Sequence, residues 1–324
     1  MKLVYVIEHF SVMGGVERIV ASKMNALAER GHDVTLLTVW KENLPLAFPL
    51  NDKIHRLCLN IKEPQSKPAY LWTLPRIVRC FDRTVRDINP DTVLLFRAVG
   101  ALIAGWTSWK GRMVFESHGA RWSNNHLWLY PRMERRVESV VCLTRGDADE
   151  YKRARRVAVI PNFTDIKPKG APDYEAHRCV FVGRPCPEKN IERLERLWKR
   201  LHQTHPDWVL ERHHQTEDMA SAYQRGSILV MTSRSEGFPM SLAEAQKCGL
   251  PCVAFDCKYG PSDIIVDGET GYVIPYDDDD AFVEKAELLM DDAALRRRMG
   301  EAAQKNMTRF EKEKIIAEWE RFLS

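Results

Sequence analysis

The sequence contains no Cys-x-x-Cys pair, the commonest signature of a zinc or dithiol site. Its eight cysteines are scattered, and the cluster at 248, 252 and 257 lacks the spacing of a usual zinc site. Cys142 and Cys179 lie in apolar runs, where a thiol acts as a small hydrophobic side chain. We therefore predict free thiols and a reducing environment.

Long hydrophobic runs are also missing. The longest apolar run is Ala98 to Trp106, whereas a membrane-spanning helix needs roughly 20 residues. Met1 leads directly into a strand-like segment, so we expect no signal peptide. With 44% hydrophobic and 29% charged residues, the composition predicts a soluble globular protein, and the predicted free thiols indicate the cytoplasm.

There is little excess charge of either sign, because the net charge is only +3 over 324 residues. This gives no indication of a nucleic-acid partner. Two stretches, 76–86 and 132–138, are locally basic and partly apolar. They fit either solvated helix faces or attraction to an anionic membrane surface.

The sequence lacks both the G-x-G-x-x-G fingerprint and a Walker loop, so neither dinucleotide nor P-loop binding is supported. Gly14 and Gly15 follow the first predicted strand and open a helix. Glycines at a helix start let the backbone approach an anionic ligand, although a simple tight turn needs them equally.

Strand-like and helix-like segments alternate along the chain, which predicts parallel sheets covered by helices. A segment rich in proline and glycine, 161–177, interrupts this alternation and reads as a linker. We expect one domain over 1–165, a second over 175–305, and a C-terminal helix over 306–324 that packs back towards the first. The predicted strands are 2–8, 32–40, 92–97, 113–119, 139–145, 157–162, 178–183, 228–233, 251–256 and 271–275, and the main predicted helices are 14–31, 69–91, 190–206, 240–249 and much of 277–324.

The run of four aspartates at 277–280 suggests a metal site at first sight. It directly precedes a helical pattern, where aspartates commonly cap free N–H groups. We interpret it as a loop and helix cap, and we predict no metal site.

Residues 183–190 follow the first strand of the second domain. Gly183 frees the turn, and Arg184 and Lys189 flank two prolines that stiffen the loop. Two cations held on a rigid loop can neutralise a diphosphate without a metal. The alternative is a pair of ordinary surface cations.

Residues 228–249 form another strand-to-helix segment, in which Pro239 suits the first helical position and Gly249 the position past the end. The amides near Gly237, Phe238 and Met240 would then face the expected cleft. Glu236 precedes this helix and Glu244 lies within it. Without a ligand role, Glu236 would be a cap and Glu244 a surface residue.

Together, Gly183-Arg184-x4-Lys189 and Glu236-x7-Glu244 resemble the donor site of glycosyltransferase family 4. The resemblance extends over nearly the whole chain and is strongest over 180–300. It implies the GT-B fold, an α/β architecture with two Rossmann-like domains facing a cleft, and retention of configuration at the transferred sugar. Further matching segments are GGVERIV, ESHG, VIPN, GLPCVAFD, GPSDIIVDGETGYVI and LRRRMGEAAQ.

The resemblance assigns the matching residues to roles. Arg184 and Lys189 would hold the donor diphosphate, with Gly183 and the helix start of Gly237, Phe238, Pro239 and Met240. Glu236 would lie by the transferred sugar, and Glu244 would contact the ribose. From the other domain, Gly14 and Gly15 would approach the phosphates and His118 the donor sugar. The implied catalytic set is Glu236, His118, Arg184 and Lys189.

The implied function is a metal-independent hexosyltransferase of polysaccharide or lipopolysaccharide synthesis. Its donor would be a UDP- or GDP-linked sugar, its acceptor a glycan or polyprenyl-linked glycan, and no cofactor is expected. Peripheral contact with the inner membrane face would involve the region 70–86. The alternatives are an epimerase or phosphorylase of the same fold, and a degraded relative that only binds.

The second domain departs from the family pattern. In residues 207–233, a predicted helix is followed almost directly by the next predicted strand. On the order of 30 residues, including a strand and a helix that help form the base pocket, would be absent by comparison with a usual βαβ repeat. Segment 212–218 could supply replacement contacts, although we interpret His213 and His214 as a strand end. Asn190 stands where the family commonly has glycine.

Overall fold

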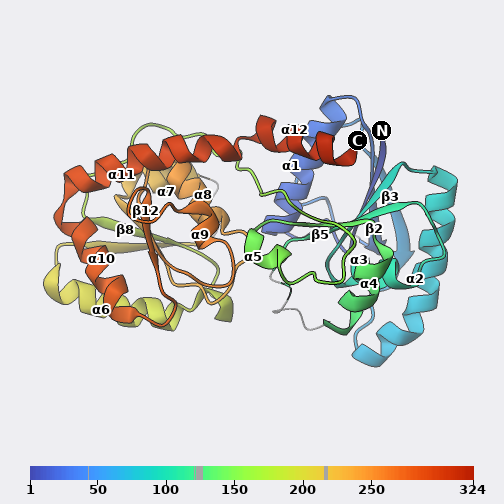
Figure 1. Ribbon diagram of the computed structural model, residues 1–324, viewed down its shortest axis with the longest axis horizontal. Helices are drawn as coiled ribbons and strands as arrows, with labels where there is room; N and C mark the ends of the chain where they lie inside the picture. The colour runs from blue at the N-terminus through green and yellow to red at the C-terminus, as the bar shows by residue number, and fades with distance from the viewer. Residues whose placement is uncertain (43, 120, 122–126, 215–217) are drawn as a thin grey trace. The chain divides into compact units, whose positions relative to one another are not determined.

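A computed structural model describes residues 1–42, 44–119, 121, 127–214 and 218–324, and it divides into two compact units (Figure 1). Unit 1 comprises Met1–Ile160 with Ile316–Ser324, and unit 2 comprises Pro161–Ile315. Each unit contains one sheet flanked by helices, as Figure 1 shows. The two-unit α/β class predicted from the alternating pattern is confirmed.

Unit 1 is built on a seven-stranded parallel sheet in the order β3-β2-β1-β4-β5-β6-β7. Its central strands are almost fully buried, which explains why their sequences are continuous apolar runs rather than alternating ones. The strands are β1 (Lys2–Ile7), β2 (Asp33–Trp40), β3 (His55–Ile61), β4 (Thr92–Phe96), β5 (Arg112–Ser117), β6 (Ser139–Cys142) and β7 (Val157–Val159), and the helices are α1 (Gly15–Glu29), α2 (Lys67–Ile88), α3 (Arg97–Trp106), η2 (Leu127–Leu129), α4 (Tyr130–Arg136) and α5 (Arg145–Ala148).

Unit 2 is built on a five-stranded parallel sheet in the order β12-β11-β10-β8-β9. Helices α6 and α10 pack side by side, with Leu197 and Phe282 in the core beneath them (Figure 1). The strands are β8 (Arg178–Val182), β9 (Val209–His213), β10 (Ile228–Met231), β11 (Cys252–Phe255) and β12 (Gly271–Ile274), and the helices are η3 (Pro187–Lys189), α6 (Ile191–Thr204), α7 (Met219–Arg225), α8 (Met240–Lys247), α9 (Pro261–Ile264), α10 (Asp279–Asp291), α11 (Ala293–Asn306) and η4 (Met307–Phe310).

Two strands and a helix differ from the sequence prediction. The strand β3 was not predicted at all, and β9 and α7 occupy the segment that we expected to pass almost directly to the next strand. Both strands lie at sheet edges and carry mostly polar or half-exposed side chains, so they lack the apolar run of a central strand. The two histidines do mark a strand end, because β9 ends at His213.

Helix ends follow the predicted capping residues with small shifts. Gly31 and Gly249 both follow helices with φ of 91°, the left-handed conformation that favours glycine after a helix. Pro239 is the N-cap of α8 rather than its first residue. The aspartate run is confirmed as a cap, because the Asp278 side chain accepts a hydrogen bond from the Ala281 amide.

The last helix, α12 (Lys312–Leu323), begins in unit 2, and its residues from Ile316 onwards belong to unit 1. Arg30 Nη1 donates to Glu320 Oε2 at 2.7 Å, and Arg112 donates to the carbonyl of Phe322 at 2.9 Å. Trp319 is buried against unit 1 residues. Residues near the C-terminus therefore complete the core of the N-terminal unit.

All eight cysteines are free, and Cys142 and Cys179 are buried as predicted. Within the described ranges, no helix is both long enough and apolar enough to cross a membrane. In the same ranges, no three His, Cys, Asp or Glu side chains gather as a metal site.

Candidate active site

Two of the predicted segments meet at the carboxyl edge of the unit 2 sheet. Strands β8 and β10 are neighbours, so the loops that follow them, 183–190 and 232–239, lie next to each other. Several hydrogen bonds join these loops: for example, Thr232 Oγ1 donates to the carbonyl of Lys189 at 3.1 Å, and the Arg234 amide donates to the carbonyl of Glu188 at 2.7 Å. The topology therefore brings together residues that are about 50 positions apart in the sequence, within the dimensions of a βαβ unit.

Lys189 and Glu236 form an ion pair across these loops, with Nζ and Oε1 at 2.7 Å. The side chains are only 19% and 14% exposed, so their interaction is less screened than that of a surface pair. Gly183 makes room for the lysine, because a Cβ at this position would lie 2.9 Å from Lys189 Cδ. Arg184, in the same loop, is exposed.

The backbone of Glu236 is fixed by the loop after β11. Its amide donates to the carbonyl of Lys258 at 3.1 Å, and its carbonyl accepts from the Tyr259 amide at 3.2 Å. Gly260, with φ of 111°, packs against Pro239, where a Cβ would lie 2.4 Å from the proline Cδ. The carboxylate of Glu236 is therefore carried on a loop held from two sides.

Helix α8 begins immediately after this loop and has no side-chain cap at its start. Phe238 is buried and its ring contacts that of Phe310, with centroids 5.6 Å apart. The first-turn amides of an uncapped helix and its dipole favour a negative charge. Gly237 and Phe238 precede this helix, Pro239 is its N-cap and Met240 is its first residue.

Glu244 lies inside α8 and is buried, so the alternative of a surface residue is wrong. Tyr223 of α7 donates from its hydroxyl to Glu244 Oε2 at 3.3 Å. Burial, reinforced by the negative charge of Glu244, raises the pKa of Tyr223, so the phenol keeps its proton and can act as the donor. Tyr223 was not selected from the sequence, because it lies in the segment where we expected no helix.

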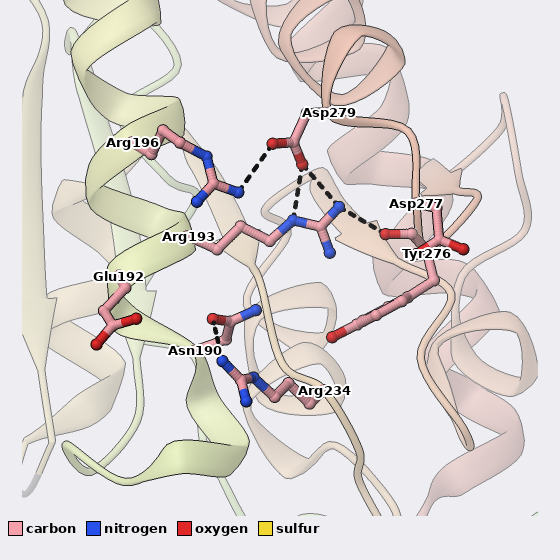
Figure 2. Close-up of a pocket in the computed structure, with 8 residues that line it drawn as sticks. All are labelled: Asn190, Glu192, Arg193, Arg196, Arg234, Tyr276, Asp277 and Asp279. Atoms are coloured by element: carbon pink, nitrogen blue, oxygen red, sulfur yellow. Dashed lines mark hydrogen bonds and ion pairs between the residues drawn. The ribbon is translucent and has the colours of Figure 1, made fainter.

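Asn190 adopts a backbone conformation that suits the glycine expected at this position from the family resemblance. Its φ is 53°, in the left-handed region that glycine and asparagine adopt most readily. The Asn190 side chain accepts from Arg234 Nη2 at 3.3 Å, as Figure 2 shows. The substitution therefore preserves the backbone conformation between Lys189 and α6.

A pocket of about 460 Å³ opens beside Asn190, and sequence reasoning did not predict it (Figure 2). Arg193 crosses it, donating to Asp279 Oδ1 and to the carbonyl of Tyr276, and its guanidinium lies 3.6 Å from the Phe255 ring centroid. Arg196 donates to the second oxygen of Asp279 at 3.0 Å. Since Asp279 binds two of the arginines, much of the positive charge here is already compensated. The lining residues are Asn190, Glu192, Arg193, Arg196, Arg234, Tyr276, Asp277 and Asp279.

The remaining predicted residues belong to unit 1. Gly14 is the N-cap of α1, and a Cβ on it would lie 2.1 Å from Glu17 Oε2, so any side chain there would displace Glu17. Glu17 is buried and pairs with Arg97 Nη2 at 2.6 Å. Gly15 has open space around its Cα, so its side of the loop is accessible.

His118 follows β5, and its side chain is only 3% exposed. Its Nε2 lies 2.8 Å from Glu116 Oε1, and the other oxygen of Glu116 pairs with Lys23. Neither Glu116 nor Lys23 was selected from the sequence. Part of the segment proposed to replace base contacts, 215–217, lies outside the described residues, and Arg212 at its start pairs with Glu195 at 2.9 Å.

Comparison with known proteins gives two family matches. The model described as Glycosyltransferase Family 4 matches residues 13–168, and the model described as Glycosyl transferases group 1 matches residues 212–306. The amylovoran biosynthesis glycosyltransferase AmsD of Erwinia amylovora is 25% identical over 371 aligned residues, covering 100% of this chain and 99% of the relative. That alignment is longer than the 324-residue chain, so the relative contains segments that this chain lacks.

Solved structures agree in fold. The lipopolysaccharide outer core galactosyltransferase WaaB superposes with a TM-score of 0.81 at 17% identity, covering 99% of this chain and 98% of that one. Anabaena HepE, in complex with UDP and glucose, gives a TM-score of 0.76 at 15% identity over 100% of this chain and 99% of its own. With the two family matches and the two parallel-sheet units, these findings show that the chain is a glycosyltransferase and belongs to family 4, with the GT-B fold.

Proposed function

We propose that the chain is a retaining glycosyltransferase that moves a sugar from a UDP- or GDP-linked donor to a glycan or lipid-linked acceptor during the synthesis of bacterial cell-surface polysaccharide. The relatives named for amylovoran and lipopolysaccharide synthesis support this class of acceptor. The structure of HepE with UDP and glucose supports a nucleotide-sugar donor. The observation that carries the proposal is the Lys189–Glu236 pair beside the uncapped start of α8.

In this proposal the positive charge of the site serves the leaving diphosphate. Negative charge builds on that group as the glycosidic bond breaks, and Arg184, Lys189 and the α8 amides would stabilise it. Glu236 and Glu244 are carboxylates and accept hydrogen bonds from hydroxyl groups, which suits the transferred sugar and the ribose. The acceptor hydroxyl would attack from the face that the diphosphate leaves, so configuration is retained.

The diphosphate would compete with Glu236 for Lys189. The two side chains neutralise each other, with Lys189 Nζ and Glu236 Oε1 2.7 Å apart. A bound diphosphate offers Lys189 a second anion and leaves the Glu236 carboxylate to the sugar hydroxyls. Ligand binding and the placement of Glu236 are therefore coupled.

The test is a thermal-unfolding panel with UDP, GDP, ADP, CMP and their sugar conjugates. A ligand that binds only the folded protein adds about 2.7 kcal/mol of stability at 100 times its Kd. We expect one nucleotide class to raise the unfolding temperature, and its sugar conjugate to release sugar to an acceptor. The proposal is wrong if none of these ligands stabilises the protein.

We also propose peripheral contact with the inner membrane face through α2. Trp72 is 86% exposed there, and the outward-facing Arg76, Arg79 and Arg83 follow it along the helix. A large apolar ring beside several cations fits an anionic lipid surface.

Co-sedimentation with vesicles tests this contact. We expect binding to vesicles that contain phosphatidylglycerol but not to pure phosphatidylcholine, and a clear loss of binding in Trp72→Ala and at high salt, where charge attraction is screened. Leu44→Ala is the matched control, since Leu44 is an exposed apolar residue (70%) outside α2. Equal binding by wild type and Trp72→Ala would count against this surface.

A further inference from the structure

Unit 1 contains a buried charge cluster that none of the roles above uses. Lys23 on α1 and Glu116 on β5 form an ion pair, and both side chains are only 1% exposed. The second oxygen of Glu116 lies 2.8 Å from His118 Nε2. One carboxylate therefore bridges a fully buried ammonium and the histidine that the family resemblance places beside the donor sugar.

Aromatic rings enclose the ammonium group. Lys23 Nζ lies 3.8 Å from the ring centroid of Trp319, and also faces the rings of Tyr5 and Phe96 at 5.5 and 5.8 Å. The Phe96 ring in turn contacts His118, with centroids 5.6 Å apart. Ring faces attract a cation, most strongly when water is excluded. Trp319 comes from α12, so the C-terminal helix closes this cluster.

The protonation states follow from these contacts. Burial opposes the charge on Glu116, but Lys23 and His118 outweigh this effect and hold the pKa of Glu116 at about 2. An ionised carboxylate can only accept hydrogen bonds. His118 Nε2 must therefore carry the hydrogen, and in the neutral ring Nδ1 is the acceptor.

Stability alone gives a weak reason for such a cluster. Replacing a buried ion pair by apolar side chains of similar size is often neutral or stabilising, because both charges lose their hydration. The carboxylate–histidine hydrogen bond, by contrast, fixes ring orientation and tautomer in many sites. A role in stability alone therefore gives no reason for the hydrogen bond between Glu116 and His118.

We propose that Glu116 is a positioning residue for His118, holding the ring so that Nδ1 accepts a hydrogen bond from a sugar hydroxyl, and that Lys23, held under Trp319, tunes this interaction. The proposal rests on the proposed function and on the place beside the donor sugar that the family resemblance implies for His118. Glu116 and Lys23 act through His118 and touch no substrate.

The charged and titratable groups that face Glu116 are Lys23 from α1, Tyr5 from β1 and His118 beyond β5. Burial, followed by the charge of Glu116, raises the pKa of Tyr5, so this phenol stays neutral. Burial lowers the pKa of Lys23 against the opposing effect of Glu116. The helix α12 contributes the Trp319 ring to the cluster.

The geometry predicts different effects of two substitutions on the His118 ring. In Glu116→Gln the partner is an amide, which can donate as well as accept, so the ring is no longer restricted to the tautomer with hydrogen on Nε2. In Lys23→Met the carboxylate remains, so Nε2 keeps its hydrogen.

The experiment is ¹⁵N-correlated NMR of the neutral histidine rings on the whole protein without nucleotide, with His118→Gln for assignment. In the wild type and in Lys23→Met we expect the His118 ring to carry its hydrogen on Nε2, and in Glu116→Gln we expect a mixture of the two tautomers. The kcat of Glu116→Gln, measured with the sugar nucleotide that the panel selects, should fall as the Nε2 tautomer is lost. A wild-type ring with its hydrogen on Nδ1, or a kcat that stays fixed while the tautomer changes, would overturn the proposal.

The double variant Lys23→Met with Glu116→Gln serves as the control for misfolding, because it leaves neither Lys23 nor Glu116 as an unpaired buried charge. We expect it to fold, with a kcat at least tenfold lower and a donor KM within about twofold of wild type, as for loss of an interaction made only in the transition state. Glu320→Gln loosens α12 without touching the cluster and should keep full kcat. A folded double variant with wild-type kcat contradicts the proposal, whereas a protein that no sugar nucleotide stabilises contradicts the proposed function itself.

Discussion

Replacing Glu236 with alanine is expected to lower kcat for sugar transfer on the order of 10²–10³-fold, the usual effect of removing one preorganised group at the reacting centre. Nucleotide affinity should stay the same or increase. The reason is the 2.7 Å contact with Lys189: once the carboxylate is gone, the ammonium group is fully available to the diphosphate. Transfer kinetics and calorimetric binding of the nucleotide, measured on the same preparation, separate the two effects.

Two further variants test whether the effect of Glu236→Ala comes from the loss of the carboxylate charge at this position. Glu236→Gln keeps an acceptor for sugar hydroxyls but loses the charge, so its kcat should fall between those of wild type and Glu236→Ala. Glu192→Ala removes an exposed carboxylate from the same unit and should change neither quantity. If Glu236→Ala loses binding and transfer in equal measure, the carboxylate does not lie at the transferred sugar.

The second large effect is expected for the two loop cations. Arg184→Ala and Lys189→Ala should each weaken nucleoside diphosphate binding by roughly 10–100-fold, because a hydrogen bond to a charged group contributes about 1.5–3 kcal/mol. Binding of the matching nucleoside monophosphate should change less. Calorimetry with both nucleotides measures this difference.

Lys189→Ala is expected to be the more damaging of the two. It removes a cation and also leaves the Glu236 carboxylate unpaired beside the diphosphate, which it repels. Removing Glu236 as well should therefore restore part of the lost affinity, which a double-mutant cycle detects as a coupling energy. Additive effects of Lys189→Ala and Glu236→Ala would show that the ion pair has no part in binding.

The matched control for the cations is Arg196→Ala. Arg196 is an arginine of the same unit, 61% exposed and paired with Asp279 rather than placed in the loop after β8. Its loss should leave diphosphate affinity within about twofold, because exposed ion pairs contribute little. A decrease as large as that of Arg184→Ala would indicate a general effect of positive charge, not a specific site.

The loop geometry of unit 2 could be predicted from local sequence. Gly249 and the two prolines that follow Arg184 specify a helix end and a stiff loop by their own backbone preferences, and the apolar runs of β8 and β10 place the loops at one sheet edge. The edge strands β3 and β9 escaped prediction because their side chains are mostly polar or half-exposed. Apolar periodicity, the signal used, is weak in such strands.

Contacts between residues far apart in the sequence were not predictable in the same way. Lys23 lies on a helix whose pattern suggests an ordinary surface lysine, and nothing near it in the sequence indicates burial beside Glu116. Tyr223 reaches Glu244 from a helix that the pattern did not show. These side chains meet only because the sheet order brings their elements together.

The path of α12 has a consequence for biosynthesis. Because unit 2 is inserted between Ile160 and Ile316 of unit 1, the N-terminal unit is the first to be translated and the last to be completed. Until Trp319 leaves the ribosome, Lys23 and Glu116 lack the ring that covers them. The nascent N-terminal unit therefore lacks part of its core throughout the synthesis of the second unit, and its final packing step waits until α12 has been made.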